Sequence, residues 1–445
     1  MANSAPAKPE ASLSVIDGVA ILVGIVIGIG IFKTPPLVAA NVGSEAAFLG
    51  VWLLGGVLAL IGVLCYAELA SAHPDAGGEY HFLTRAYGPS LGMLFAWARG
   101  TVIQTGAIAA VAFVFGDYAN ILIPLGAYGP SIHAVVALIA VTAVNLIGTM
   151  QGKQAQIVFT ALTILAVAAV VAAGWLAPVG VKPPIGAAGG GGAGLAMVFI
   201  LLTYGGWNEA AYLSGEMRDV QRNMARTLVV GVTAVIVVYM AVNFAYLNVF
   251  GLEGVRQSKA IAADLMTAVV GEKGALMLSL IVCVAAISTL NGTVFTGART
   301  YYALGRDLGM ARALGAWQSQ GDKPTHALLL QGAIALVLIG FGAVTRDGFE
   351  AMVAYTAPVF WFFLFLVGLS IYVFRWRDKD RVLPFRVPLY PITPAVFCLT
   401  CVWMLYSSLA YAGPGAIIGV LVLLAGTPLL LLRRRAGAKA KPQSS

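Results

Sequence analysis

The sequence predicts an all-α membrane protein of 12 transmembrane helices, arranged as a 5+5 inverted repeat followed by two C-terminal helices. Hydrophobic residues make up 60% of the 445 residues and charged residues only 10%, against about 25% charged in a soluble protein. Twelve apolar stretches approach the roughly 20 residues that a helix needs to cross a bilayer. Glycines interrupt the first and the sixth stretch, the spacing expected if spans 1–5 and 6–10 are two repeats. A chain this apolar has too little polar surface for a soluble enzyme.

The 12 spans follow one another with short connections. They are predicted at 14–41, 45–72, 90–122, 131–150, 154–177, 193–216, 225–250, 272–300, 325–345, 349–375, 390–411 and 414–433. The resulting segments are a cytoplasmic N-terminal tail (1–13), the first repeat (14–177), a Gly/Pro-rich outer linker (178–192), the second repeat (193–375), helices 11 and 12 (376–433) and a basic cytoplasmic tail (434–445). Prolines such as Pro124, Pro178 and Pro324 fall near span ends, where a missing backbone donor is tolerated.

The basic residues predict that both termini are cytoplasmic. Of the 27 Lys and Arg residues, 20 fall in the predicted inner loops and tails, Lys33 and Arg99 fall inside spans, and five fall in outer loops (Lys182, Arg256, Lys259, Lys273 and Arg346). Positive residues favour the cytoplasmic side, and two cytoplasmic ends require an even number of spans. The net charge of +8 is therefore attributed to membrane orientation rather than to nucleic-acid binding. The expected location is the plasma or inner membrane.

Three other features indicate neither a cleaved signal peptide nor a phosphate-binding, metal or redox site. No small-residue cleavage site follows the N-terminal tail, so the first apolar segment is expected to remain as a helix. The run Gly186–Gly194 lacks the GK[ST] of a phosphate loop. Cys398 and Cys401 form a CxxC without a second pair or a nearby histidine, so they are interpreted as buried small apolar residues.

The two glycine-containing interruptions indicate a binding site. The first span contains Gly24, Gly28 and Gly30, and each glycine weakens a helix by about 1 kcal/mol relative to alanine. Close packing through a GxxxG pair is the alternative explanation. The sixth span contains Tyr204-Gly205-Gly206-Trp207-Asn208-Glu209, a Gly-Gly pair followed by polar residues. Interruptions in corresponding helices of two repeats are typical of a transporter binding site.

A pair of broken helices suits an amino acid. A break leaves free N–H groups at the start of the second half of the helix and free C=O groups at the end of the first half. The N–H end binds a carboxylate, and the C=O end accepts hydrogen bonds from an ammonium group. One zwitterion can therefore bridge both ends, and glycine allows its close approach to the backbone.

The residues around the breaks resemble the amino acid–polyamine–organocation (APC) superfamily. Gly28-Ile29-Gly30-Ile31-Phe32 is similar to its GSGIF stretch, and Pro74–Tyr80 with Arg85–Gly88 resembles its loop after helix 2. Tyr204–Asn208 resembles helix 6 of the L-type amino acid transporter light subunits, and Ile287–Gly292, with Arg299 and Arg306, is similar to helix 8 of that branch. The resemblance covers nearly the whole chain and implies a LeuT-like fold and an amino acid permease.

The resemblance also implies residue roles. The N–H groups of Ile29, Gly30 and Ile31 would bind the substrate carboxylate, and Gly28 precedes them. The ammonium group would lie at the carbonyls of Val26, Leu202 and Gly205. The remaining substrate-binding candidates, which would shape the unwound part of helix 6, are Tyr204, Gly206, Trp207 and Asn208.

The chain departs from the family pattern at three positions. Ile29 stands where the family commonly has a serine, which removes one hydroxyl contact to the carboxylate. Leu202 stands where an aromatic gate is common. Thr163 stands where sodium-independent members often have a lysine in helix 5, so its hydroxyl and those of Ser288 and Thr289 form a candidate sodium site. The alternative is that these hydroxyls bond back to their own helices.

Ionisable residues at membrane depth are the other candidates for ion coupling. Lys33 follows the break in helix 1, and Glu209 follows the break in helix 6. A structural Lys–Glu pair, a snorkelling Lys33 and proton binding at Glu209 all remain open. Arg99 is expected to contact Glu68, Glu79 or the carbonyls of a helix end.

The leading hypothesis is a secondary active transporter of neutral α-amino acids that works by alternating access. No ATP-binding P-loop is present, so a proton gradient or exchange is expected to drive it. A carrier of cationic amino acids or amines and a sodium-coupled carrier are the alternatives, and the inverted repeat argues against an ion channel. No span contains a catalytic set, so no enzyme activity is expected. No cofactor, nucleic acid or partner subunit is required by the sequence.

Overall fold

The computed structural model describes most of the chain, including most of the two predicted repeats. The described residues are 13–75, 77–147, 153–177, 183, 184, 186, 192–209, 217–308, 324–345, 347–411 and 413–428. The N-terminal tail up to residue 12, most of the predicted linker 178–192, the end of the predicted sixth span (210–216) and the basic tail 434–445 lie outside them.

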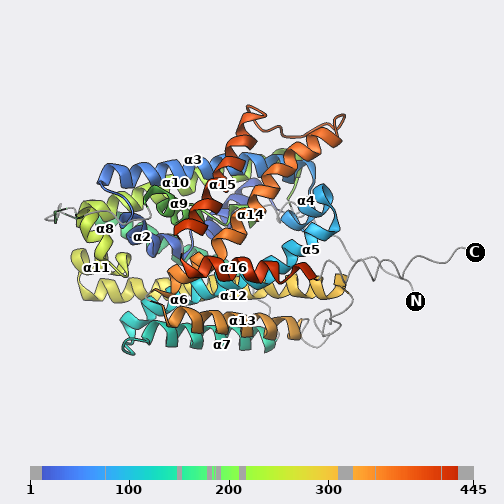
Figure 1. Ribbon diagram of the computed structural model, residues 1–445. Coiled ribbons are helices and arrows are strands. Elements are labelled where there is room, and N and C mark those ends of the chain that lie inside the picture. Colours follow the sequence, from blue (N-terminus) through green and yellow to red (C-terminus); the bar gives the residue numbers. More distant parts are fainter. Residues whose placement is uncertain are drawn as a thin grey trace, which may run out of the picture.

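Helices form most of the described part of the chain (Figure 1). In order they are α1 (Val15–Val26), η1 (Ile29–Phe32), α2 (Thr34–Ala39), α3 (Glu45–Ala72), α4 (Gly78–Tyr87), α5 (Pro89–Ala98), η2 (Arg99–Gln104), α6 (Thr105–Leu122), α7 (Gly129–Ile147), α8 (Lys153–Leu176), α9 (Gly192–Thr203), α10 (Val220–Gln257), α11 (Ile261–Val270), α12 (Glu272–Leu308), α13 (Thr325–Ala343), α14 (Gly348–Arg377), α15 (Ile392–Tyr411) and α16 (Pro414–Leu424).

The helices agree with an all-helical membrane protein. Within the described residues, nine helices are long and apolar enough to cross a membrane, and Ala161–Leu176, Ile261–Val270 and Pro414–Leu424 are shorter apolar helices. The number of 12 spans and the inverted repeat stay predictions. Two helices, α4 and α11, lie in segments that the sequence assigned to loops. Each has only 10 residues, which is too short to span a bilayer.

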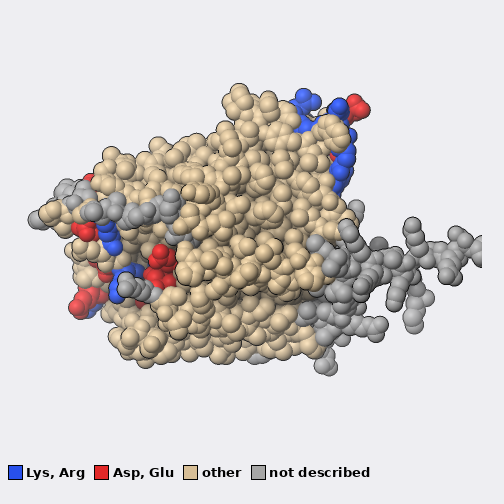
Figure 2. Space-filling model, in the orientation of Figure 1, with Lys and Arg blue, Asp and Glu red and all other residues tan. Residues whose placement is uncertain are grey.

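On the face shown in Figure 2, the charged side chains that reach the surface lie near the ends of the molecule. Figure 2 shows Lys, Arg, Asp and Glu at two opposite ends of one face, with a broad band of other residues between them. This distribution is the one that a bilayer requires, because charged groups are costly in its centre.

Local sequence fixes where the site-forming helices begin. α1 starts with a capping box, in which Asp17 N–H donates to Ser14 Oγ (3.3 Å) and Ser14 N–H donates to the Asp17 carboxylate (3.0 Å), and each side chain satisfies a donor of the first turn. α14 is capped by Asp347, which accepts from Glu350 N–H at 3.0 Å. The predicted third span is continuous over α5, η2 and α6, and η2 is a π-helical segment that begins at Arg99.

Candidate functional site

The first span is broken at Gly28. α1 ends at Val26, and Gly28 takes an extended conformation (φ −95°, ψ −156°) before the short 3₁₀ helix η1. In a 3₁₀ helix the third residue already bonds back to the residue before the helix, so the N–H of Ile31 is used within η1. Among the residues that the structure describes, the N–H groups of Ile29 and Gly30 at its start have no backbone partner outside η1, and the role of all three N–H groups in carboxylate binding stays a prediction.

The sixth span is broken directly after Thr203, where α9 ends. Gly205 N–H donates to the carbonyl of Leu202 (3.1 Å), and Gly206 N–H donates to Asn208 Oδ1 (3.3 Å). Gly206 has φ +99°, in the left-handed region that a Cβ disfavours. This glycine therefore permits the sharp turn that ends the helix.

Both breaks line one cavity of about 950 Å³, which is within the range of about 300–1,000 Å³ typical of ligand sites. The predicted site residues that line it are Val26, Gly28, Ile29, Gly30, Leu202, Gly205, Gly206, Asn208, Glu209, Ser288 and Thr289. Five predicted residues do not line it: Ile31, Lys33, Thr163, Tyr204 and Trp207.

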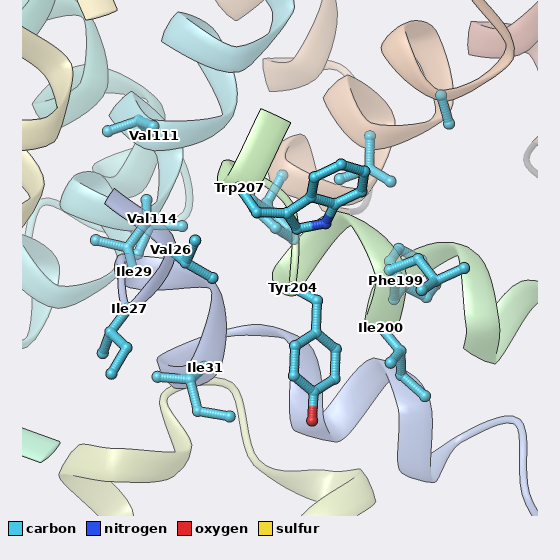
Figure 3. Close-up of a cluster of buried hydrophobic side chains, with 14 of the residues drawn as sticks. Val26, Ile27, Ile29, Ile31, Val111, Val114, Phe199, Ile200, Tyr204 and Trp207 are labelled. Atoms are coloured by element: carbon cyan, nitrogen blue, oxygen red, sulfur yellow. The ribbon is translucent and has the colours of Figure 1, made fainter. Parts of the chain in front are cut away.

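Tyr204 and Trp207 pack into the protein behind the second break. The Tyr204 ring lies 5.0 Å from Tyr239 and 6.0 Å from Trp52, measured between centroids. The Trp207 ring lies 4.9 Å from Tyr66. Figure 3 shows both rings standing apart from Ile29 and Val26. Both side chains therefore pack behind the break, where they support the turn, and their contact with substrate stays a prediction.

Tyr239 of α10 connects the two breaks and was not predicted from the sequence. Its hydroxyl lies 2.6 Å from the Val26 carbonyl and 3.2 Å from the Thr203 carbonyl. The Val26 carbonyl also accepts from Gly28 N–H at 2.7 Å, so protein groups already occupy the acceptor that was predicted for the ammonium group. The only sequence signal was a tyrosine inside an apolar span, whose hydroxyl needs a partner when buried.

Thr34 and Thr203 make a second connection between the breaks. Thr203 Oγ1 lies 2.8 Å from Thr34 Oγ1, and Thr34 Oγ1 donates to the Gly30 carbonyl at 2.9 Å. A Cβ placed on Gly30 would lie 3.1 Å from Thr203 Cγ2. The close approach of the two chains therefore favours a glycine at position 30, because a larger residue would require Thr203 to shift.

A buried charge network lies on one wall of the cavity. Arg99 donates to Glu209 with two contacts of 2.9 Å and to Glu79 at 3.4 Å. Glu79 also accepts from Tyr66 (2.6 Å) and Asn208 (3.1 Å). Of the partners predicted for Arg99, Glu79 is confirmed. Glu68 is not, because it pairs with Arg375 in a bidentate contact of 2.7–2.8 Å.

Lys33 lies in a different ion-pair cluster. Its Nζ is 2.8 Å from Asp117 of α6 and 3.0 Å from Asp347 at the start of α14, and its side chain is 7% exposed. A Lys33–Glu209 pair is therefore absent from the described contacts, and the partner of Glu209 is Arg99. The sequence could not reveal this pairing because Lys33 and Asp347 are 314 positions apart.

The hydroxyls proposed for sodium are divided between the cavity and the protein interior. Ser288 and Thr289 line the cavity, whereas Thr163 is 8% exposed and does not. Thr289 Oγ1 donates to the carbonyl of Ala285 at 3.1 Å, the bond back to its own helix that was the alternative interpretation. The described residues contain no cluster of three His, Cys, Asp or Glu side chains suited to a metal ion.

Comparison with known proteins identifies the family. The sequence model described as amino acid permease matches residues 13–425. The chain is 33% identical over 409 residues to the b(0,+)-type amino acid transporter 1 of Rattus norvegicus, covering 89% of this chain and 82% of that protein. It is 30% identical over 406 residues to the Homo sapiens protein of the same name, covering 89% and 82%.

A second group of relatives supports the same assignment. The chain is 27% identical over 443 residues to the large neutral amino acids transporter small subunit 2 of Mus musculus, covering 94% of this chain and 80% of that protein. These matches confirm the resemblance to the APC superfamily and to its L-type light-subunit branch, and the relatives are transporters rather than enzymes. The chain therefore belongs to the amino acid permease family.

Proposed function

We propose that the chain is a secondary active transporter that binds a neutral α-amino acid between its two helix breaks. The observation that supports this most directly is that one continuous cavity is lined both by Gly28–Gly30 and by Gly205–Gly206. The free N–H groups of Ile29 and Gly30 would bind the carboxylate, because helix N-termini favour anions. The ammonium group would lie at the carbonyl ends of α1 and α9, including Leu202 and Gly205.

The charge network favours neutral substrates over cationic ones. Glu79 and Glu209 are the two carboxylates among the described residues that line the cavity, and both contact Arg99. A cationic side chain would have to displace this guanidinium to gain a carboxylate partner. One relative is named for large neutral amino acids, which agrees with this choice. Cationic amino acids and amines are the alternative substrates.

An alternating-access mechanism would open the cavity to one side of the membrane at a time. The cavity extends along α1 from Gly28 back to Ala20, toward the proposed cytoplasmic side. On the opposite side Lys33 joins the first broken helix to α6 and α14 through Asp117 and Asp347. Movement of these ion pairs would open the outer side of the site. The proposed orientation has both termini in the cytoplasm and the chain in the plasma membrane.

The test is uptake of labelled neutral amino acids by the purified chain in liposomes, without any partner subunit. We expect counterflow with a saturable neutral substrate and no transport of cationic amino acids. A preference for cationic substrates would favour the alternative substrate class. Failure of the chain to transport alone, with recovery on adding a second subunit, would contradict the prediction that no partner is required.

Glu209→Gln is expected to retain amino acid counterflow and to lose uptake driven by an inward proton gradient. The Glu209 side chain is 37% exposed and follows the break, so its contact with water should change as the helix moves. Uptake with and without a pH gradient measures the effect, and Glu272→Gln at the exposed start of α12 is the control. Gradient-driven accumulation by the mutant would show that Glu209 only pairs with Arg99. Dependence of the wild type on sodium would instead favour Thr163, Ser288 and Thr289.

Ile29→Ser is expected to bind substrate more tightly but to unfold more easily. The added hydroxyl can donate to the carboxylate, and one net hydrogen bond contributes about 0.5–1.5 kcal/mol. Ile29 is 6% exposed and belongs to a cluster with Val111 and Val114 (Figure 3), and truncation there costs about 2–4 kcal/mol. Calorimetry measures the substrate affinity and thermal unfolding measures the stability. Ile29→Val is the control for both measurements. Weaker binding by a folded Ile29→Ser protein would show that the isoleucine itself contacts substrate.

A further inference from the structure

A second cavity, of about 290 Å³, lies where α3 and α14 end. It shares no described lining residue with the central cavity. Its wall includes the segment between α14 and α15, residues 378–391. Basic side chains gather at the end of the molecule where Figure 1 shows this segment (Figure 2).

The cavity carries an excess of positive charge. Four basic residues line it, namely Arg375, Lys379, Arg381 and Arg386, and two acidic residues, Glu68 and Asp378. The Glu68 carboxylate already accepts three hydrogen bonds, from Arg375 at 2.7 and 2.8 Å and from the Val387 N–H at 2.6 Å. Arg375 is therefore neutralised inside the wall.

Asp378 lies near two arginines outside the cavity lining, although its Oδ2 has no hydrogen-bond partner among the described residues. Its carboxylate lies 3.5 Å from Arg377 and 3.9 Å from Arg85. Within the described ranges, no carboxylate lies within 4.0 Å of the cationic groups of Lys379, Arg381 or Arg386. Three cations thus converge on the cavity without a protein anion.

His73 is a buried polar residue of the cavity wall whose missing hydrogen-bond partner suggests a bound ligand. The residue lines the cavity and is 3% exposed, and its Nδ1 has no hydrogen-bond partner among the described residues. Burial, together with the charges of Arg381 and Arg85, lowers the pKa of His73 to about 4. The ring is therefore neutral at pH 7 and can donate one N–H. Leaving a buried polar group unpaired costs about 1–3 kcal/mol, which a bound acceptor would recover.

We propose that this cavity binds a phosphate group, held by Lys379, Arg381 and Arg386 and by the Nδ1–H of His73. Phosphate oxygens accept charge-assisted hydrogen bonds from several cations at once. Two exposed apolar side chains lie close to these basic residues in the chain: Trp376 (74%) in the last turn of α14 and Val382 (84%) in the segment that follows it. In the proposed orientation they face the cytoplasmic membrane surface, where basic pockets between helix ends bind acidic lipid headgroups. A phospholipid headgroup is therefore favoured over free phosphate.

The test measures binding of dioctanoyl phosphatidylglycerol, dioctanoyl phosphatidylcholine and inorganic phosphate to the purified full-length protein in detergent. We expect saturable binding of phosphatidylglycerol and weaker binding of phosphatidylcholine. The variant K379Q/R386Q should bind phosphatidylglycerol roughly tenfold or more weakly, the value of a lost charge-assisted hydrogen bond. His73→Leu should weaken binding by about two- to tenfold, because it removes one neutral donor.

Lys273→Gln, an exposed lysine in α12, is the matched control and should bind like the wild type. Lys379 and Arg386 are exposed, so the double variant should keep the wild-type unfolding temperature without ligand. Binding of inorganic phosphate as strong as that of the lipid would assign the site to free phosphate. No binding of either ligand, or equal binding by K379Q/R386Q and the wild type, would overturn the proposal. These measurements do not depend on transport.

Discussion

Gly206→Val is expected to abolish substrate binding while the protein still inserts into the membrane. Position 206 has φ +99°, which costs an L-residue about 1–2 kcal/mol, and a β-branched side chain fits it worst. A Cβ there would lie 3.1 Å from Ile25 Cγ2 and 3.5 Å from the Ile25 carbonyl oxygen. The substitution therefore strains the turn after α9 and crowds Ile25 at the end of α1, beside the proposed carboxylate and ammonium sites.

Isothermal titration calorimetry with a neutral amino acid measures this effect, and size-exclusion chromatography verifies that the variant is folded. Gly340→Val is the matched control, because it is the same substitution in α13 and its Cβ would meet no heavy atom within 4 Å. It should bind substrate as the wild type does. Wild-type affinity in Gly206→Val would show that the substrate does not bind at the second break.

Arg99→Gln is expected to destabilise the protein by about 3–5 kcal/mol, the usual effect of removing one partner of a buried ion pair. The Arg99 and Glu79 side chains are 10% and 5% exposed. Without the guanidinium, Glu79 is left as a buried carboxylate beside Glu209. Tyr66 and Asn208 still donate to Glu79, but neither supplies a positive charge.

Thermal unfolding in detergent measures this loss, and the second-site change Glu79→Gln should restore part of it. Glutamine keeps the oxygen that accepts from Tyr66 and Asn208 and removes the unpaired charge. Lys273→Gln removes an exposed positive charge and should change stability by no more than about 0.5 kcal/mol. If Arg99→Gln unfolds at the wild-type temperature, or if Glu79→Gln brings no recovery, the network does not stabilise the fold.

Composition and the positions of the glycines were sufficient to predict a helical membrane protein with two interrupted spans. Apolar segments long enough to cross a bilayer can adopt few structures other than helices, because every backbone group must be paired in lipid. Gly206 shows why the break was visible in the sequence: a left-handed residue in a membrane helix needs glycine. The family resemblance followed from local motifs as well, two at the breaks and others in the loop after helix 2 and in helix 8.

Only the tertiary structure decided the partners of the buried groups. Lys33 and Glu209 both follow a break, yet Lys33 pairs with Asp117 and Asp347 while Glu209 pairs with Arg99. The Tyr239 hydroxyl hydrogen-bonds to the carbonyl of Val26. This carbonyl was predicted from the sequence to bind the ammonium group of the substrate. A sequence specifies which residues can carry charge or donate hydrogen bonds, but these pairs depend on how helices far apart in the chain rotate against one another. The packing of their apolar faces sets that rotation, and no local pattern encodes it.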